Sequence, residues 1–269
     1  MKYRKLKIGL VISMALSVMA FVLFQRPIDL RPVTIKNGIS SEQFRQGKIL
    51  LAEMQNAYGG KKAWLAKKTG SYEQIAEWYG NLLLSGWDTL PQRFQMTSIL
   101  GTDNSEMTLL NGLNNGQKWG VEDWKSYRMD AQGVKTFQPH EQYQHKLIYK
   151  NYWFQFPFRI DEAPIIAYAG ESIVDGKTYD LLYATWGSES PNAKYDQYVL
   201  YLDKETKHIE WLNFTVREKF KSVKLTARFT DIKEVDGIFC PFSQYLFIGT
   251  PENRIRKLHE NHYQWIWFG

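Results

Sequence analysis

The feature that most constrains this chain is a series of β-rich runs separated by turn residues between Phe158 and Ile248. Two of the turns place Asp-Gly between apolar residues, in Val174–Lys177 and Val235–Ile238. Asp-Gly is a strong hairpin signal, because glycine adopts positive φ without a steric cost. Between these turns, runs rich in aromatic and β-branched residues lie at 180–186, 195–202 and 209–216. The pattern predicts a meander of antiparallel strands.

The residues before the meander begin with a predicted helix. Ser40 and Gln43 have the spacing of a capping box, and apolar residues at helical spacing continue to Tyr58. Gly59-Gly60 then ends the helix. A second, short helix is expected over 61–68. Helices that precede a sheet usually pack on one of its faces, so their apolar residues are expected to belong to the core.

The rest of the chain is predicted to add strands and one more helix to the same domain. An apolar insertion, 80–91, lies between two strands and is either buried or a flap over a cavity. We predict one domain over 40–269, preceded by a linker over 27–39, which contains two prolines. The remaining expected elements are strands over 71–131, a helix over 139–152 that ends at Phe156-Pro157, and a final strand over 256–268.

The first 26 residues predict an export segment. Residues 1–7 are basic, and residues 8–24 are almost entirely apolar, which is the pattern of a signal peptide or a signal anchor. Val18-Met-Ala20 resembles a cleavage site, but the apolar run continues to Phe24 with no polar region after it. We therefore favour an uncleaved anchor that holds the chain in the membrane through 8–24. The basic start places the N-terminus in the cytoplasm and the domain outside.

The charge of the chain does not indicate nucleic-acid binding. The net charge is +6, but five of the basic residues lie before Asp29 with no acidic residue among them. The remainder carries a net charge of only +1. A nucleic-acid-binding domain would need a basic face of its own.

We find no motif for catalysis, metal binding or a cofactor. Cys240 is the single cysteine, so it predicts neither a disulfide within the chain nor a structural zinc site. His259 and His262 are three residues apart in a predicted strand, which directs their rings to opposite faces. A zinc protease needs the pair four apart on a helix. We therefore expect a protein that is not an enzyme, with no catalytic residue, no metal ligand and no cofactor.

The order of elements resembles the envelope proteins that have the fold of the lipoprotein carriers LolA and LolB, and is most similar to bacterial relatives of unassigned function. The motifs that carry the resemblance are Gly59-Gly60-x-x-x-Trp64, Phe156-Pro-Phe-Arg159, Val174-Asp-Gly-Lys-Thr-Tyr179 and Val235-Asp-Gly237. The resemblance implies an α+β, mainly β fold. In it a strongly curved antiparallel sheet, an incomplete barrel, has helices packed on its open side and an apolar cavity between them. In the carriers that cavity holds acyl chains.

The resemblance also implies a place in the bacterial cell envelope. The domain would lie on the periplasmic side, anchored to the inner membrane, or be secreted to the periplasm if the N-terminal segment is cleaved. The carriers are soluble or lipid-anchored. This chain has no cysteine after its apolar segment, so we expect a peptide anchor instead.

Two functions follow from these expectations. The first is a membrane-tethered extracytoplasmic binding protein for an apolar ligand, such as a lipid or a lipoprotein acyl chain. The alternative is an envelope structural or interaction protein with a filled core and no small ligand. Arg159 is included among the ligand-binding residues as a polar candidate, although a structural salt bridge is its preferred interpretation. The candidate ligand-binding residues are Leu83, Trp87, Tyr152, Trp153, Phe154, Phe156, Arg159 and Trp186.

Overall fold

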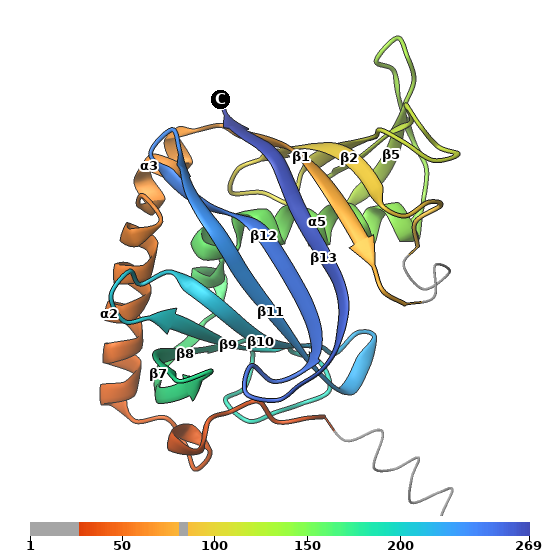
Figure 1. Ribbon diagram of the computed structural model, residues 1–269. Coiled ribbons are helices and arrows are strands. Elements are labelled where there is room, and N and C mark those ends of the chain that lie inside the picture. Colours follow the sequence, from red (N-terminus) through yellow and green to blue (C-terminus); the bar gives the residue numbers. More distant parts are fainter. Residues whose placement is uncertain (1–26, 81–85) are drawn as a thin grey trace, which may run out of the picture.

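The computed structural model describes residues 27–80 and 86–269. Within these ranges thirteen strands form one antiparallel sheet, in the order β6-β5-β4-β3-β2-β1-β13-β12-β11-β10-β9-β8-β7. The sheet is open and strongly curved (Figure 1). The strands are β1 (Thr69–Trp78), β2 (Gln92–Ile99), β3 (Ser105–Leu109), β4 (Lys118–Glu122), β5 (Lys125–Met129), β6 (Lys135–Phe137), β7 (Ile165–Val174), β8 (Lys177–Thr185), β9 (Gln197–Asp203), β10 (Ile209–Val216), β11 (Phe220–Val235), β12 (Ile238–Gly249) and β13 (Arg254–Phe268).

The predicted meander is confirmed, and its turns have the expected chemistry. Both residues of the Asp175-Gly176 pair have positive φ, +51° and +82°, as do Asp236 and Gly237. This is the combination that a type I′ hairpin turn requires. The last strand, β13, pairs with β1, so it joins the two halves of the sheet (Figure 1).

The first helix, α2 (Ser41–Ala57), begins at the predicted capping box. The Ser40 hydroxyl accepts the Gln43 backbone N–H at 3.2 Å, and the Gln43 side chain accepts the Ser40 backbone N–H at 2.9 Å. Its close contact with the sheet depends on Gly47, where an added Cβ would lie 2.5 Å from Ala167 Cα in β7. The short helix α3 (Lys61–Ala66) follows Gly59-Gly60.

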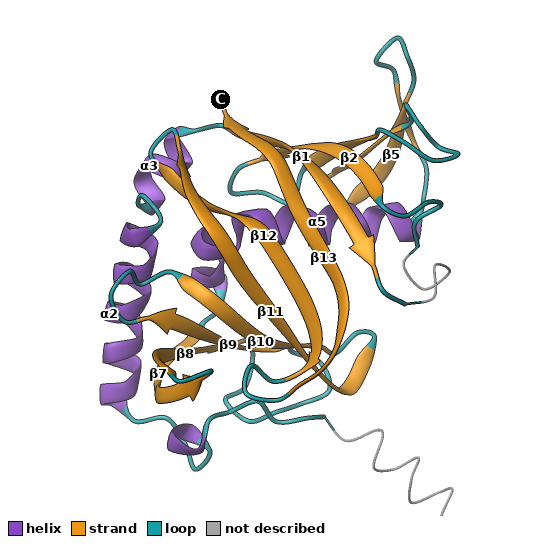
Figure 2. Ribbon diagram, viewed as in Figure 1, coloured by secondary structure: helices purple, strands orange, loops and turns teal. Residues whose placement is uncertain are grey.

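The second long helix, α5 (Glu141–Arg159), crosses the concave side of the sheet (Figure 2). Its Leu147 and Phe156 are buried in one core cluster with inward-facing strand residues such as Leu200. The sheet therefore curves around α5, while α2 covers β7 and β8 beside it (Figure 1).

The expected end of this helix at Phe156-Pro157 is wrong. The helix continues through Pro157 to Arg159 and then into the 3₁₀ turn η2 (Ile160–Glu162). Proline removes only the one N–H that would bond to the Trp153 carbonyl, near the end of the helix. Burial of Phe158 and Ile160 holds this final turn in place.

Residues 27–39, the expected linker, lie against the outer face of the sheet instead of extending away from it. They include the 3₁₀ turn η1 (Val33–Ile35). Ile35 is fully buried, in a second cluster with outward-facing residues such as Tyr183. The Leu30 backbone N–H donates to Gln197 Oε1 at 2.9 Å. Apolar residues of this segment, Ile28, Leu30, Ile35 and Ile39, thus cover a part of the sheet that the two long helices leave open.

The predicted membrane segment, 8–24, lies outside the described residues. Within the part of the chain that the structure describes, no helix combines the length and the apolar character needed to cross a bilayer.

Candidate functional site

Three small cavities lie between α5 and the inner face of the sheet. The first, of about 20 Å³, is beside the C-terminal half of the helix. Its walls are almost entirely apolar and come from α2, α3, α5 and strands β10 to β13. Its lining includes Tyr58, Trp64, Trp153, Phe154, Phe156, Phe158, Phe229, Phe239, Gln244, Tyr263, Ile266 and Phe268.

The other two cavities continue along α5 toward its N-terminus. The second, also about 20 Å³, shares Trp153, Gln244 and Tyr263 with the first. The third, of about 120 Å³, shares Lys150 and His259 with the second. Its complete lining is Ala76, Glu77, Trp78, Trp87, His145, Lys146, Tyr149, Lys150, His259 and Asn261.

Because neighbouring cavities share walls, they form a series from His145 to Phe158, which we call the interior track. A helix rises about 1.5 Å per residue, so the track is roughly 20 Å long. At its wide end His145 and Lys146 are only half-buried, so this end reaches the surface. At the other end Trp64 and Phe158 are buried and stacked on each other, with ring centroids 4.9 Å apart.

Aromatic side chains nearly fill the track. The Trp153 ring lies 5.0 Å from Phe214 and 5.9 Å from Phe229, measured between ring centroids. Each of the two narrow cavities has room for about one water molecule, whereas pockets that hold small ligands usually exceed 300 Å³. An acyl chain would fit only after these side chains move.

The wide end of the track is polar and positively charged. Lys150 Nζ donates to Gln74 Oε1 at 2.7 Å and to Asn261 Oδ1 at 2.8 Å, which ties α5 to β1 and β13. One turn earlier, Lys146 Nζ donates to the Gly86 carbonyl and lies 3.6 Å from the centroid of the Trp87 ring. A cation this close to an indole face is stabilised by the quadrupole of the ring.

Burial changes the titration of these groups. Loss of hydration lowers the pKa of Lys150 to about 7, with the Lys146 charge acting in the same direction. Burial also lowers the pKa of Lys146 to about 7, against an opposing attraction to Asp88. The pKa of His259 falls to about 3, mainly through burial and then through repulsion from Lys150. His259 is therefore a neutral imidazole at neutral pH, while both lysines titrate there.

Four of the predicted ligand-binding residues line the interior track. Trp153, Phe154 and Phe156 face the first cavity, and Trp153 also faces the second. Trp87 lines the third cavity and stacks on Phe94 at 5.5 Å between ring centroids. These residues come from α5 and from the loop before β2, so folding brings them to one interior space.

The other predicted ligand-binding residues lie outside the interior track or outside the residues that the structure describes. Tyr152 packs against the Arg159 guanidinium, 5.2 Å from the ring centroid, and is absent from the lining of the three cavities. Trp186 packs on Tyr198 at 5.6 Å between ring centroids and is likewise outside the track. Leu83 is in the part of the 80–91 insertion that lies outside the described residues.

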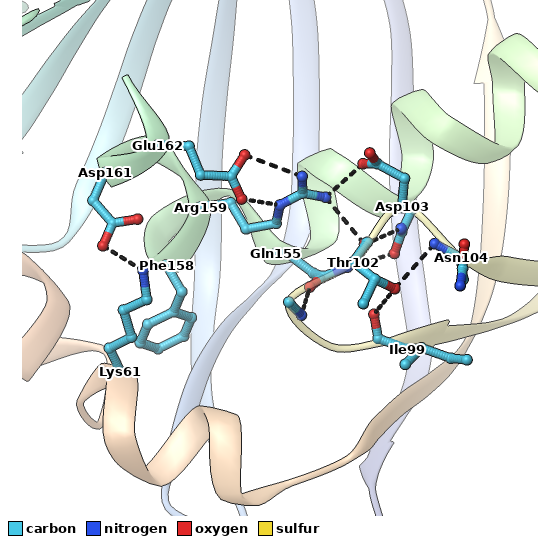
Figure 3. Close-up of polar contacts among 12 residues, drawn as sticks. Lys61, Ile99, Thr102, Asp103, Asn104, Gln155, Phe158, Arg159, Asp161 and Glu162 are labelled. Carbon is cyan, nitrogen blue, oxygen red and sulfur yellow. Dashed lines mark hydrogen bonds and ion pairs between the residues drawn. The ribbon is translucent and has the colours of Figure 1, made fainter. Parts of the chain in front are cut away.

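Arg159 is held in a polar network that joins the end of α5 to the turn after β2 (Figure 3). Its guanidinium pairs with Glu162 through two bonds of 2.7 and 3.1 Å, and with Asp103 Oδ1 at 2.8 Å. It also donates to the Thr102 carbonyl at 3.1 Å, and Gln155 Oε1 accepts the Gly101 backbone N–H at 2.7 Å. These bonds occupy the guanidinium on both sides, which is the geometry of a structural ion pair.

The sequence interpretation missed the polar residues of the track: Lys146, Lys150, His259, Gln74 and Asn261. The lysines are four residues apart, on the face of the helix that also carries Tyr143 and Leu147. Two lysines on an otherwise apolar helix face indicate a polar site inside the domain. The partners of Lys150 on β1 and β13 are 76 and 111 residues away along the chain, and the Gly86 carbonyl that Lys146 contacts is 60 residues away, so no local pattern shows that they meet.

Other chemistry is not apparent in the described part of the chain. Among the described residues no group of three or more His, Cys, Asp or Glu side chains is placed to hold a metal ion. The Cys240 thiol lines the first cavity, and burial raises its pKa to about 12, so it is protonated at neutral pH.

The fold is similar to that of two solved bacterial proteins. A DUF1329 family protein from Desulfovibrio piger matches with a TM-score of 0.54 and 15% identity, over 84% of this chain and 93% of that one. A LolA superfamily protein from Nitrosomonas europaea matches with a TM-score of 0.52 and 10% identity, over 83% and 93%. No protein-family model and no curated protein sequence matches the chain. The chain therefore has a LolA-like fold, recognised from structure and not from sequence identity.

Proposed function

We propose that the protein is an extracytoplasmic binding protein of the bacterial envelope that holds an apolar ligand, such as a lipid or a lipoprotein acyl chain, in the interior track. The observation that carries this proposal is the series of adjacent cavities along α5, which share lining residues, contain many aromatic rings and reach the surface at one end. The proposed role is binding, without catalysis.

The energetics of burial support an acyl ligand. Burying one methylene group contributes about 0.8 kcal/mol, so a chain of sixteen carbons would contribute roughly 13 kcal/mol. Part of this is lost to the ordering of the ligand and to side-chain rearrangement. In this structure the track is filled by α5 side chains such as Trp153 and Phe154. The ligand would replace contacts among these rings with contacts to itself.

The place where the described chain begins indicates which side of the domain a membrane anchor at 8–24 would approach. The Ile28 backbone N–H bonds to the Lys221 carbonyl at 3.0 Å, so the chain reaches the domain beside the turn between β10 and β11. Glu218 and Lys219 of that turn act electrostatically on His145, which lines the wide end of the track. An anchor at 8–24 would therefore keep the entrance of the track near the membrane surface.

One observation favours the alternative of an envelope interaction protein with a filled core. The two narrow cavities together have room for only a few water molecules. In that case the aromatic rings would be core packing alone, and the protein would act through its surface.

The presence or absence of a bound ligand in the purified protein distinguishes the two functions. The full chain would be isolated from a bacterial envelope in an amphipol and studied by native mass spectrometry before and after organic extraction. A stoichiometric lipid or acylated peptide that leaves on extraction supports the binding protein. Protein of the mass expected from the sequence, which also fails to cross-link a photoreactive acyl chain to α5, favours the filled core.

A further inference from the structure

We propose that the wide end of the interior track is a head-group site, in which Lys146 and Lys150 bind the carboxylate or phosphate of an anionic amphiphile while its acyl chain follows the track. The inference rests on the proposed function and names the chemical class of its ligand. Such a site would bind charged amphiphiles in preference to neutral ones, whereas a purely apolar cavity has no group that distinguishes them.

Neutral oxygens, and not carboxylates, accept the hydrogen bonds of both lysines, and Asp88 attracts Lys146 only from a distance. Lys150 bonds to two neutral amide oxygens, and Lys146 to a backbone carbonyl. Among the residues that the structure describes, neither lysine forms a salt bridge. A charge in a partly buried site is costly unless it is paired. Two such lysines, one turn apart and lining one cavity, fit a site whose counter-ion comes from a ligand.

Unused hydrogen-bond donors line the same cavity. A protonated lysine has three N–H donors, and Lys150 uses two of them on Gln74 and Asn261. The Trp78 indole N–H is buried and has no acceptor in the described part of the chain. Carboxylate and phosphate oxygens accept several such bonds at once, and bonds to an ionised acceptor are the strongest of this type.

The head-group site adjoins the apolar part of the track. Lys150 lines both the second and the third cavity, and Trp153 lies one turn further along α5 at the junction with the first. From Lys146 to Phe158 the helix rises roughly 18 Å. One leaflet of bilayer hydrocarbon is roughly 15 Å thick. The track therefore has the length of one membrane acyl chain, with the positive charge at the end that reaches water.

The titration of the lysines predicts how binding depends on pH. Other charged and titratable groups act here too: His145 on α5, His259 on β13, Glu77 on β1, Asp88 before β2, and Glu218 and Lys219 after β10. An anion stabilises the charged lysines and so raises their pKa values above 7 in the complex. Affinity should be nearly constant below pH 7 and fall above it, by up to tenfold per pH unit for each proton taken up.

The test uses the full chain in phosphatidylcholine vesicles and three photoreactive probes with the same sixteen-carbon chain. They are a fatty acid, a fatty alcohol and a monoalkyl phosphate, each carrying a diazirine near the chain terminus. Cross-linked peptides are identified by mass spectrometry, and half-saturation concentrations are compared at pH 6.5 and pH 8.5. Preference for the acid or for the phosphate identifies which anionic head group the site takes.

For the wild-type protein we expect one or both anionic probes to cross-link to α5 at least tenfold more tightly than the alcohol. Lys150→Met should weaken anion binding by about tenfold to a hundredfold, the usual effect of losing one bond to a charged group. The half-buried Lys146→Met should do the same and provides a second variant if Lys150→Met folds poorly. Both variants should weaken alcohol binding much less than anion binding, so that the preference for anions is lost. Lys48→Met, on the exposed face of α2, is the matched helical control and should leave the binding of all three probes unchanged.

The outcomes separate the two proposals. Equal binding of acid, phosphate and alcohol, or unchanged anion binding in both lysine variants, would overturn the head-group site while leaving the acyl-binding function intact. If no probe cross-links to α5, both proposals fail together.

Discussion

The Lys150 amino group donates to Asn261 Oδ1 across 2.8 Å, so a lysine of the central helix is fixed to the sheet by a neutral amide. The burial of this amino group predicts an unusual pH dependence of stability. The pKa of Lys150 is about 7 in the folded protein and near 10.5 when unfolded. Between these values the unfolded chain binds more protons, so the free energy of unfolding should rise with pH. Below pH 7 the folded protein carries the full free-energy cost of burying the charged Lys150 amino group, and above pH 7 deprotonation relieves this cost.

Urea unfolding at pH 7, 8 and 9 measures this effect. The stability of the wild-type protein should increase relative to that of Lys150→Met by up to about 1.4 kcal/mol per pH unit. Lys146 remains in both proteins, but loss of the Lys150 charge also changes its titration, so the difference reports Lys150 together with its repulsion from Lys146. Parallel pH profiles for the two proteins would show that Lys150 is charged and well hydrated in the folded state.

Because Arg159 is held in a structural ion-pair network, its removal should lower the stability of the protein without weakening ligand binding. Arg159→Gln leaves Asp103 and Glu162 without their cation at the end of α5. Breaking one partner of a buried ion pair usually costs about 3–5 kcal/mol. We expect the lower part of this range, because Glu162 is 45% exposed. The measurement is chemical unfolding of Arg159→Gln against Arg45→Gln, whose i,i+3 pair with Glu42 is exposed.

The same variant tests whether Arg159 contacts a ligand. If its role is structural, acyl-probe affinity at a temperature where both proteins are folded should match the wild type. A large loss of affinity in fully folded Arg159→Gln would return Arg159 to the binding site, as the sequence-based list of ligand residues had it.

Local chemistry explains which parts of the fold could be predicted from the sequence. The Asp175-Gly176 turn and the Ser40 cap depend on the conformation of a few adjacent residues, so short motifs identify them. The continuation of α5 past Pro157 depends on tertiary burial of Phe158 and Ile160, which no local signal shows. The candidate aromatic residues between 152 and 156 are neighbours in the sequence, but helix geometry divides them. Trp153 and Phe156 face the track, while Tyr152 faces Arg159.

The polar end of the track could not be predicted in the same way. It forms only when α5 lies inside the sheet and when β1 pairs with β13, which brings Gln74, Lys150 and Asn261 together. These are long-range consequences of topology. The resemblance to the carriers suggested a cavity, but it supplied no residue at this end.

The N-terminal segment predicts a further effect on stability. Ile35 is fully buried under the outer face of the sheet, whereas Val33 is 81% exposed. Ile35→Ala should therefore cost about 2–5 kcal/mol, the usual range for a buried large-to-small change, and Val33→Ala less than about 0.5 kcal/mol. Differential scanning calorimetry of the two variants measures the difference. Equal melting temperatures would mean that 27–39 leaves the domain surface in solution and acts as the flexible linker that the sequence suggested.

Trp153 provides the sharpest distinction between a binding protein and a filled core. It lies at the junction of the first two cavities and contacts Phe214 and Phe229. If an acyl chain must displace this ring to enter, Trp153→Ala removes the obstacle and should speed uptake of a photoreactive fatty acid severalfold, while costing about 3–5 kcal/mol of stability. Trp186→Ala is the matched control, since Trp186 is half-buried but outside the track.

The comparison depends on the wild-type protein as well as on the variant. Faster uptake in Trp153→Ala than in a wild-type protein that itself takes up the acid, with no change in Trp186→Ala, supports a track that opens around Trp153. Uptake by the variant alone would show only that truncation created a new cavity, because a void lined by apolar side chains can bind apolar molecules whatever the function of the protein. That result, with an inert wild type, would identify Trp153 as core packing and favour the envelope interaction protein.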